Sequence, residues 1–339
     1  MAERLKVSTL QESELPELAP FLLGVFGNTP GHRPFRDEAL RWKAFAPHPL
    51  ATEPRSYVAR YGGKMIGHGM MVPLRFGRGS ECLRAQCIVD WAADPSMGGG
   101  GVSVYKHLAN LADVQIGIGG SEEGKKTIQR LGFRMHQSMY SFEWIVRPFA
   151  WRTQGALDWK TPARIGRDWL RRGRGPHAPS RGLTARRVKV FSASDAPLPD
   201  AATAGGWVSE RSAESLNYVL ACPIARMDAH LILGGGEPAG YFLLSWVGAD
   251  CRIAELWIRS GAAEDWAAAA VLAARTAAED PATASVRTDV STSRVRAAFE
   301  QTGFLATGTH PVFLRDPHQR ICAGQEILLS MLDSDAFYL

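Results

Sequence analysis

The sequence has 339 residues, which allows two domains of about 150 residues each. Hydrophobic residues make up 45% of it and charged residues 22%, as in soluble globular proteins with substantial cores. The formal net charge of +5 indicates an anionic ligand or surface only weakly. No apolar run approaches the roughly 18 residues of a membrane-spanning helix, so we expect no membrane insertion.

Cysteine usage and the first residues indicate a reducing compartment. The five cysteines are scattered, and no pair has the CxxC spacing of a zinc or redox site. Residues 1–18 are charged and polar, without the apolar centre of a secretory signal. We therefore expect a cytoplasmic protein without a metal site.

Residues 1–146 have the pattern of one α/β unit. A hairpin is expected to turn at Gly62-Gly63, a dipeptide that suits a tight turn, and the last helix to stop at Gly132. In chain order, the sequence predicts a helix over 15–27, hairpin strands over 56–60 and 64–76, a strand over 83–94, a helix over 102–112, a strand over 114–120, a helix over 121–133 and a strand over 135–146.

Residues 147–189 are strongly basic, with twelve Lys/Arg and two Asp, and they mix Pro and Gly with three tryptophans. One interpretation is a contact with nucleic acid or another anionic surface. The other is a solvated connector that packs its Trp rings against both domains. We favour the connector, and no nucleic-acid partner, because nothing in the segment matches a nucleic-acid-binding fold.

Residues 190–320 repeat the plan of the first unit. The segment 210–223 resembles 37–49 in position, and the last helix ends in Gly-Phe like its earlier counterpart. This matching order predicts an internal duplication. The expected elements are a hairpin over 229–247, a strand over 252–261, an alanine-rich helix over 264–280, a strand over 284–290 and a helix over 293–304.

The strongest local signal is a run of four glycines, residues 98–101, between a strand and a helix. Without Cβ atoms, successive N–H groups can point into one concavity, and the helix N-terminus behind them adds partial positive charge. This position predicts a pyrophosphate-binding loop. The alternative is a flexible loop without a ligand, which the placement between strand and helix makes less favoured.

The glycine run also resembles a motif of the GCN5-related N-acetyltransferase superfamily. That motif has Pro, two residues, Arg or Gln, two residues, Gly, one residue, then Gly or Ala. Pro95 and Gly101 fit it, whereas Gly98 stands at the Arg/Gln position and Ser103 at the last one. The strand and helix over 114–133, which end in Leu-Gly-Phe, are similar to the next motif of the superfamily.

This resemblance implies an α/β (α+β) fold with two tandem domains, each a mixed, mostly antiparallel central sheet flanked by helices. The first domain, 1–146, would bind acetyl-CoA or another acyl-CoA, and the acceptor would be an amine of a small molecule or sugar. The second, 190–339, would be degenerate for CoA, because one glycine and two acids replace the loop there. The residues expected to contact the cofactor are Trp91, Ala92, Gly98, Gly99, Gly100, Gly101, Val102 and Ser103.

Acyl transfer to an amine needs a general base. Asp90, at the end of the central strand, and His68, on the hairpin, are the candidates. Their structural alternatives are a carboxylate that caps the glycine loop and ordinary strand packing. We expect Glu122 to be a helix N-terminal acid and His107 to lie on the surface. Ile128 stands where the superfamily often has a tyrosine, so the usual general acid is missing.

The segment 37–43, followed by Pro47 and Pro49, resembles tandem acyltransferases linked to bacterial extracellular and capsular polysaccharide synthesis. Trp42 and Lys43 would then line an acceptor pocket, although helix packing is the favoured role for both.

Three classes of protein remain possible from the sequence. The first is an active N-acyltransferase that uses acyl-CoA. The second is a non-catalytic protein that binds CoA or a precursor, and the third uses the basic segment 147–189 to bind an anionic surface. The acceptor, the acyl length and the oligomeric state stay open.

Overall fold

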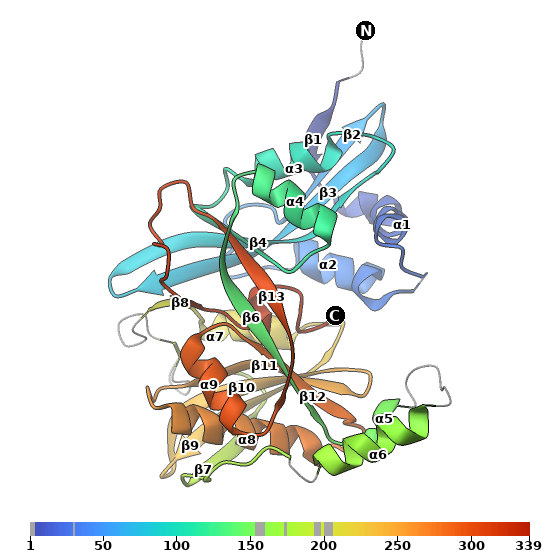
Figure 1. The fold of residues 1–339 in the computed structure, drawn as a ribbon. Coiled ribbons are helices and arrows are strands. Elements are labelled where there is room, and N and C mark those ends of the chain that lie inside the picture. Colours follow the sequence, from blue (N-terminus) through green and yellow to red (C-terminus); the bar gives the residue numbers. More distant parts are fainter. Residues whose placement is uncertain (1–3, 30, 153–159, 173–174, 193–197, 200–205) are drawn as a thin grey trace.

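One sheet runs through both halves of the protein in the computed structural model, which describes residues 4–29, 31–152, 160–172, 175–192, 198–199 and 206–339. Its strand order is β1-β2-β3-β4-β5-β13-β6-β12-β11-β10-β9-β7, with β8 and β14 attached beside β3. The first half occupies the top of Figure 1 and the second half the bottom.

The elements of the first half follow the prediction closely. The helix expected over 102–112 begins two residues earlier, inside the glycine run. The strands are β1 (Lys6–Thr9), β2 (Ser56–Tyr61), β3 (Lys64–Arg78), β4 (Glu81–Ala93), β5 (Val114–Ile118) and β6 (Arg134–Ile145), and the helices are α1 (Leu15–Phe26), α2 (Asp37–Phe45), α3 (Gly100–Leu108) and α4 (Glu122–Arg130).

The elements of the second half follow a similar order, with one helix in place of α1 and α2 and with residues 183–188 as the edge strand that corresponds to β1. They are β8 (Trp207–Ser209), α7 (Ala213–Leu220), β9 (Arg226–Gly234), β10 (Glu237–Val247), β11 (Asp250–Ile258), α8 (Ala263–Glu279), β12 (Ser285–Val290), α9 (Ser293–Gln301), β13 (Leu305–Arg315) and β14 (Ile327–Leu328). No helix among the described residues is long and apolar enough to span a membrane.

Each half is completed by a strand from the other half. Strand β13 lies between β5 and β6 and is antiparallel to both, with Val312 opposite Ile118 and Gly308 opposite Ser141. Strand β6 in turn pairs antiparallel with β12. The two long strands cross side by side at the centre of Figure 1. The fold class expected from the sequence is therefore correct, but the two domains share their sheet.

The segment 147–189 is more than a connector. It contains α5 (Pro148–Arg152), α6 (Thr161–Arg172) and β7 (Leu183–Val188), and β7 forms the edge of the sheet by pairing with β9. Asp168 on α6 is fully buried and accepts a hydrogen bond from Arg152 at 2.7 Å. Part of the basic excess is thus used inside the fold; residues 153–159 and 173–174 lie outside the described residues.

The first half has a hydrophobic layer on each face of its sheet. Side chains alternate between faces along a strand, so β3 directs Met70 toward α1 and α2 and its neighbour Met71 toward α3. Gly67 and Gly69 let α3 approach β3 closely, since a Cβ at Gly67 would lie 2.6 Å from the Gly100 carbonyl carbon. Helix α3 is therefore fixed by backbone contact.

Because the halves exchange strands, we expect them to unfold together. Leu314→Ala in β13 removes a buried side chain that packs in the first half although its strand belongs to the second. The substitution should lower the stability of the whole protein by about 2–5 kcal/mol in one cooperative transition. Denaturant unfolding followed by fluorescence and circular dichroism measures this. Thr309→Ala, at an exposed position of the same strand, is the control, and two separate transitions would contradict the shared sheet.

Candidate active site

Strand β4 carries a β-bulge in its second part. His68 of β3 pairs with Ala92 and Met70 pairs with Val89, so two residues of β4, Asp90 and Trp91, lie opposite the single residue Gly69. Asp90 has a φ of 48°, an uncommon conformation for a residue with a side chain. The bulge redirects the β4 backbone at the point where the sequence placed the candidate base.

His68 holds this bulge from the neighbouring strand. Its Nδ1 lies 2.9 Å from the Asp90 carbonyl oxygen, and its Nε2 lies 2.8 Å from the Ser56 hydroxyl. A carbonyl only accepts, so Nδ1 carries the proton and Nε2 accepts from Ser56. Burial lowers the pKa of His68 to about 4, and both ring nitrogens of this fully buried, neutral imidazole are used. The geometry favours a positioning role over the general base expected from the sequence.

Strands β4 and β5 pair over only three residues, in the middle of β4 and at the start of β5. The parallel ladder joins Ala85, Gln86 and Cys87 to residues 114–116, and no further pair follows toward the bulge. Strand β13 pairs with the other edge of β5, over Gln115 to Ile118, and so does not fill the gap beside β4. The two strands therefore part before β4 reaches its bulge, which leaves backbone groups of β4 without a β5 partner.

A buried polar network fixes α3 above this divergence. The side-chain amides of Gln86 and Gln115 both donate to the Leu108 carbonyl, at 2.8 and 3.2 Å. The Tyr105 hydroxyl donates to Gln115 at 3.0 Å, and burial raises its pKa to about 12. Because the last turn of α3 is held where the strands part, its first turn must lie further along β4, near the bulge.

The four glycines have two different roles. A Cβ at Gly100 would overlap the Ile66 carbonyl, so this glycine is required for packing. Gly98 and Gly99 are exposed with open space around them, and Gly99 has a φ of 90°. The Gly101 carbonyl accepts a hydrogen bond from the Trp91 indole at 2.9 Å. Sequence reasoning did not separate these roles, because the close approach of α3 to β3 is a tertiary contact.

The start of α3, which follows the exposed Gly98 and Gly99, offers hydrogen-bond donors. The first N–H groups of a helix have no acceptor within the helix, and Gly99 provides no side-chain cap. The preceding turn is shaped by Asp94, whose carboxylate accepts from the Ser96 N–H and hydroxyl and pairs with Lys64. These contacts hold the pKa of Asp94 down to about 2. A rigid turn followed by an uncapped helix N-terminus is a suitable anion site.

The side chain of Asp90 is buried on the opposite face, against α2. Its carboxylate lies 2.5 Å from the ammonium group of Lys43, and both side chains are almost completely buried. The Lys43 ammonium also lies 5.2 Å from the centre of the Phe35 ring. Lys43 thus has an electrostatic role rather than only the packing role favoured from the sequence. In the sequence, the position of Lys43 among the apolar residues of an amphipathic helix was the only indication that its charge is buried.

Other residues singled out in the sequence lie outside this arrangement. Glu122 is exposed in the first turn of α4, where its ion pair with Lys125 lowers its pKa. His107 is exposed on α3 and packs its ring 4.6 Å from that of Tyr57. Ile128 packs with the apolar cluster around Tyr105. Among the described residues, no group of three or more His, Cys, Asp and Glu side chains could hold a metal ion.

The second half has the same diverging strands but fills the space between them. Strands β11 and β12 pair only over Asp250–Arg252 and Ser285–Arg287. Residues 328–330 then pack beside the diverging ends and leave a cavity of only about 30 Å³. Glu255 there binds Arg211, which also pairs with Asp333 at 3.0 Å. A second half that is degenerate for CoA stays a prediction from the sequence.

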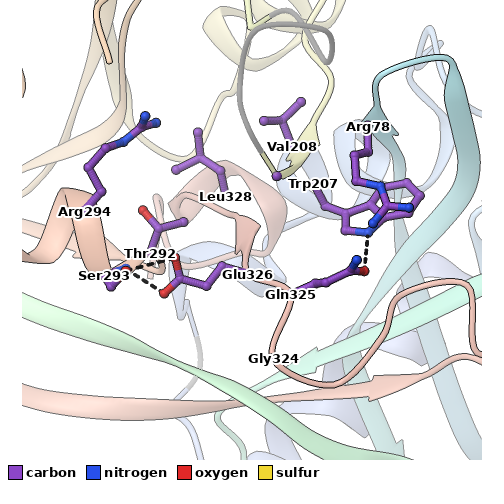
Figure 2. Close-up of a pocket in the computed structure, with 11 residues that line it drawn as sticks. Arg78, Trp207, Val208, Thr292, Ser293, Arg294, Gly324, Gln325, Glu326 and Leu328 are labelled. Carbon is purple, nitrogen blue, oxygen red and sulfur yellow. Dashed lines mark hydrogen bonds between the residues drawn. The ribbon is translucent and has the colours of Figure 1, made fainter. Parts of the chain in front are cut away.

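A large open cleft of about 710 Å³ lies between the halves but away from the bulge. Figure 2 shows Arg78 and Arg294 on opposite sides of it. The carboxylate of Glu326 accepts from the N–H of Ser293 at 2.8 Å and so caps α9. Arg78 is ten residues from His68 along β3, about 33 Å in an extended strand. The residues that line this cleft therefore do not belong to the site at the bulge.

Comparisons with solved structures agree on the class of fold. A GCN5-related N-acetyltransferase from Kribbella flavida is similar, with a TM-score of 0.57 and 15% identity, over 95% of this chain and 74% of that one. A tandem GNAT protein from the clavulanic acid biosynthesis pathway gives 0.53 and 13%, over 92% and 98%. Saccharomyces cerevisiae N-myristoyltransferase with bound myristoyl-CoA gives 0.55 and 9%, over 92% and 82%. No family model matches the sequence, and no curated protein matches it significantly.

The protein therefore has the fold of the GCN5-related N-acetyltransferases, in a tandem arrangement. At sequence identities of 9–15%, this structural similarity establishes the fold alone.

The packing role of Gly100 can be separated from the open position of Gly98. Gly100→Ala should destabilise the protein by about 1–3 kcal/mol or more, because the added methyl group meets the backbone of β3. Gly98→Ala should change stability by less than about 0.5 kcal/mol. Thermal unfolding of both variants measures this, and equal losses would contradict the placement of α3.

The buried His68 should make stability depend on pH. Its pKa in the folded state, about 4, lies below its usual value of about 6.5. The unfolded state then binds the proton more tightly, so stability present above pH 6.5 is lost as the pH falls toward 4. Between pH 7 and 4.5 this should amount to about 2–3 kcal/mol.

The comparison with His68→Asn isolates this contribution, because Asn retains a donor for the Asp90 carbonyl but does not titrate. Denaturant titrations of both proteins at several pH values should show the steeper loss only in the wild type. Parallel pH curves would mean that His68 is not held neutral by burial.

Proposed function

We propose that the protein is an acyl-CoA-dependent acyltransferase that moves an acetyl or other acyl group to an amine of a small molecule or sugar. The observation that carries this proposal is a combination of three features. Strand β4 has a bulge at Asp90–Trp91, it diverges from β5 before that bulge, and the helix that follows it, α3, has an uncapped N-terminus. The fold neighbours include transferases, one of them with myristoyl-CoA bound, which supports an acyl-CoA donor.

The loop would hold the phosphates of CoA. The exposed backbone of Gly98 and Gly99 and the N–H groups of Gly101 and Val102 at the start of α3 would supply donors without a cationic side chain, whereas the Ser103 N–H already donates to the Gly99 carbonyl. Bound acyl-CoA supplies an activated thioester. Backbone N–H groups near Trp91 and Ala92, where β4 lacks a β5 partner, would stabilise the negative charge that develops on its carbonyl oxygen.

The side chains at the bulge would position this backbone. His68 fixes the Asp90 carbonyl from one side, and Lys43 fixes the Asp90 carboxylate from the other. Protonation of Asp90 would leave the buried ammonium of Lys43 without a counter-charge, which is costly. We therefore assign Asp90 and His68 to holding the bulge in shape, and the proton acceptor must be sought nearby.

The alternative is a protein that binds CoA or a precursor without catalysis. Gly98 in place of Arg or Gln, and Ile128 in place of the usual tyrosine, favour this alternative. Turnover of the thioester with any amine would exclude it. A cytoplasmic location and a role in polysaccharide synthesis stay predictions from the sequence.

The first test is a thermal-shift titration with CoA and acetyl-CoA. Ligand at 100 times its dissociation constant should stabilise the native state by about 2.7 kcal/mol. Gly98→Asp places a carboxylate in the phosphate loop without a steric clash, so the shift should disappear while the unliganded melting temperature stays unchanged. Gly98→Ala, the matched control, should keep the shift. An equal shift in Gly98→Asp would refute the loop assignment.

A further inference from the structure

Helix α6 turns its apolar side outward. Residues that are three, four or seven positions apart share one side of a helix. One side of α6 holds five uncharged residues, all of them exposed: Pro162, Ala163, Gly166, Trp169 and Leu170. On the opposite side, Thr161 and Asp168 are buried. Helices on the surface of soluble proteins usually have the reverse arrangement, with the apolar side against the core.

The exposed side of α6 carries large apolar side chains. Leu170 is 80% exposed and Trp169 is 56% exposed. Phe149 is 67% exposed on α5, which packs against α6. Nine large hydrophobic side chains are exposed among the described residues, and three of them lie on these two consecutive helices. Exposed apolar residues that gather in this way indicate a surface for binding.

Buried polar contacts fix the orientation of α6. Asp168 accepts a hydrogen bond from Arg152 of α5 at 2.7 Å, and its side chain is completely buried. Helix α5 is held in turn by the second half, because Arg147 donates to a carbonyl of α8 at 3.2 Å and Arg287 lies 4.7 Å from the centre of the Trp151 ring. Turning the apolar side of α6 inward would separate the buried charge of Asp168 from its partner, which is costly.

Positive charge flanks the apolar side. Lys160, just before the helix, Arg164 and Arg167 follow one another at helical spacing, and Lys160 and Arg167 are exposed. The only acid of α5 and α6 is Asp168, which is buried and paired with Arg152. The whole segment 147–189 has twelve Lys/Arg and two Asp, so the segment itself can balance only two of its cations.

This combination fits the surface of a membrane that contains anionic lipid. A helix that lies in such a surface buries its apolar side at the edge of the acyl chains, while its flanking Lys and Arg meet the lipid phosphates. Trp169 suits this place because its ring is apolar and its N–H is polar. A second copy of the chain would bring like charges together, and nucleic acid would leave Trp169 and Leu170 in water.

The position of α6 leaves the candidate active site accessible. Helices α5 and α6 lie at one edge of the molecule, at the lower right of Figure 1. Helix α3, which follows the glycine loop, lies at the top of the same view. A flat surface that meets α6 therefore does not cover the glycine loop.

We propose that α6 is a membrane-binding helix, which holds the protein against a bilayer of anionic lipid without spanning it. Trp169 and Leu170 enter the boundary between headgroups and acyl chains, and Lys160 and Arg167 lie at the lipid phosphates. The contact is reversible, because one short helix buries too little apolar surface for permanent anchoring.

Co-sedimentation of the full chain with vesicles tests the choice of lipid. One set of vesicles contains phosphatidylcholine alone, and the other contains an equal mixture of phosphatidylcholine and phosphatidylserine. The protein should bind the mixture at least about 10-fold more tightly, and this binding should weaken as the salt concentration rises. Absence of binding to the mixture at low salt, or equal binding to both sets, would overturn the proposal.

Two substitutions with matched controls test the surface. Leu170→Gln removes an exposed apolar side chain and should weaken binding to the mixture about 10-fold, whereas Met135→Gln, at the other end of β6 from α5, should not. Arg167→Gln should weaken it about 5-fold, and Arg134→Gln, next to Met135, should leave it unchanged. Unchanged binding in Leu170→Gln, or equal losses in its control, would assign the contact to another surface.

Sedimentation velocity separates a membrane from a second copy of the chain. A dimer that forms as the protein concentration rises, is lost in Leu170→Gln and is accompanied by no vesicle binding would overturn the proposal. None of the four substitutions lies near the glycine loop, so each variant should keep the melting temperature and the acetyl-CoA shift of the wild type. The membrane proposal can thus fail without affecting the acyltransferase proposal, and the reverse also holds.

Discussion

The geometry of the site depends on one irregularity, the two residues of β4 that face one residue of β3. In a regular ladder, β4 would continue alongside β3, and the alternation of side chains between the two faces of the sheet would set the direction of Asp90. The bulge instead turns the Asp90 backbone into a left-handed conformation and buries its carboxylate against Lys43. His68 stabilises this conformation, because its Nδ1–H donates a hydrogen bond to the Asp90 carbonyl that the bulge reorients. Strain at this point is offset by one buried hydrogen bond and one buried ion pair.

The exchange of β6 and β13 explains why the protein needs two halves. Neither half can complete its own sheet, because the strand next to β5 comes from the second half and the strand next to β12 from the first. The second half has kept the diverging strand pair and fills it with its own residues 328–330. It has also kept a buried acid–base pair, Glu255 with Arg211, where the first half has Asp90 with Lys43. The first copy of the plan thus has the glycine loop before α3, and the second fills the space between its diverging strands.

The segment that fills the space between the diverging strands of the second half also contacts the first half. The network of Arg211, Asp333 and Glu255 holds the segment that continues to Asp335 and Tyr338. The same chain that fills the second half therefore forms a wall of a small cavity beside Lys43. Changes in the second half would alter this cavity without touching the glycine loop, because the loop is held separately by Gly100, Gln86 and Gln115.

The sequence by itself determined the order of elements, the duplicated plan and the glycine loop. These are local features: a hydrophobic period, a run of residues without Cβ, and a glycine at a helix end. It also placed Asp90 and His68 near the end of the central strand. Only the tertiary structure decided that Gly100 is needed for packing, that His68 is locked between Ser56 and Asp90, and that Lys43 neutralises Asp90. It alone also showed that β6 and β13 change places, so that each half is completed by a strand from the other. Such contacts depend on which distant surfaces meet, and no local period or spacing records that.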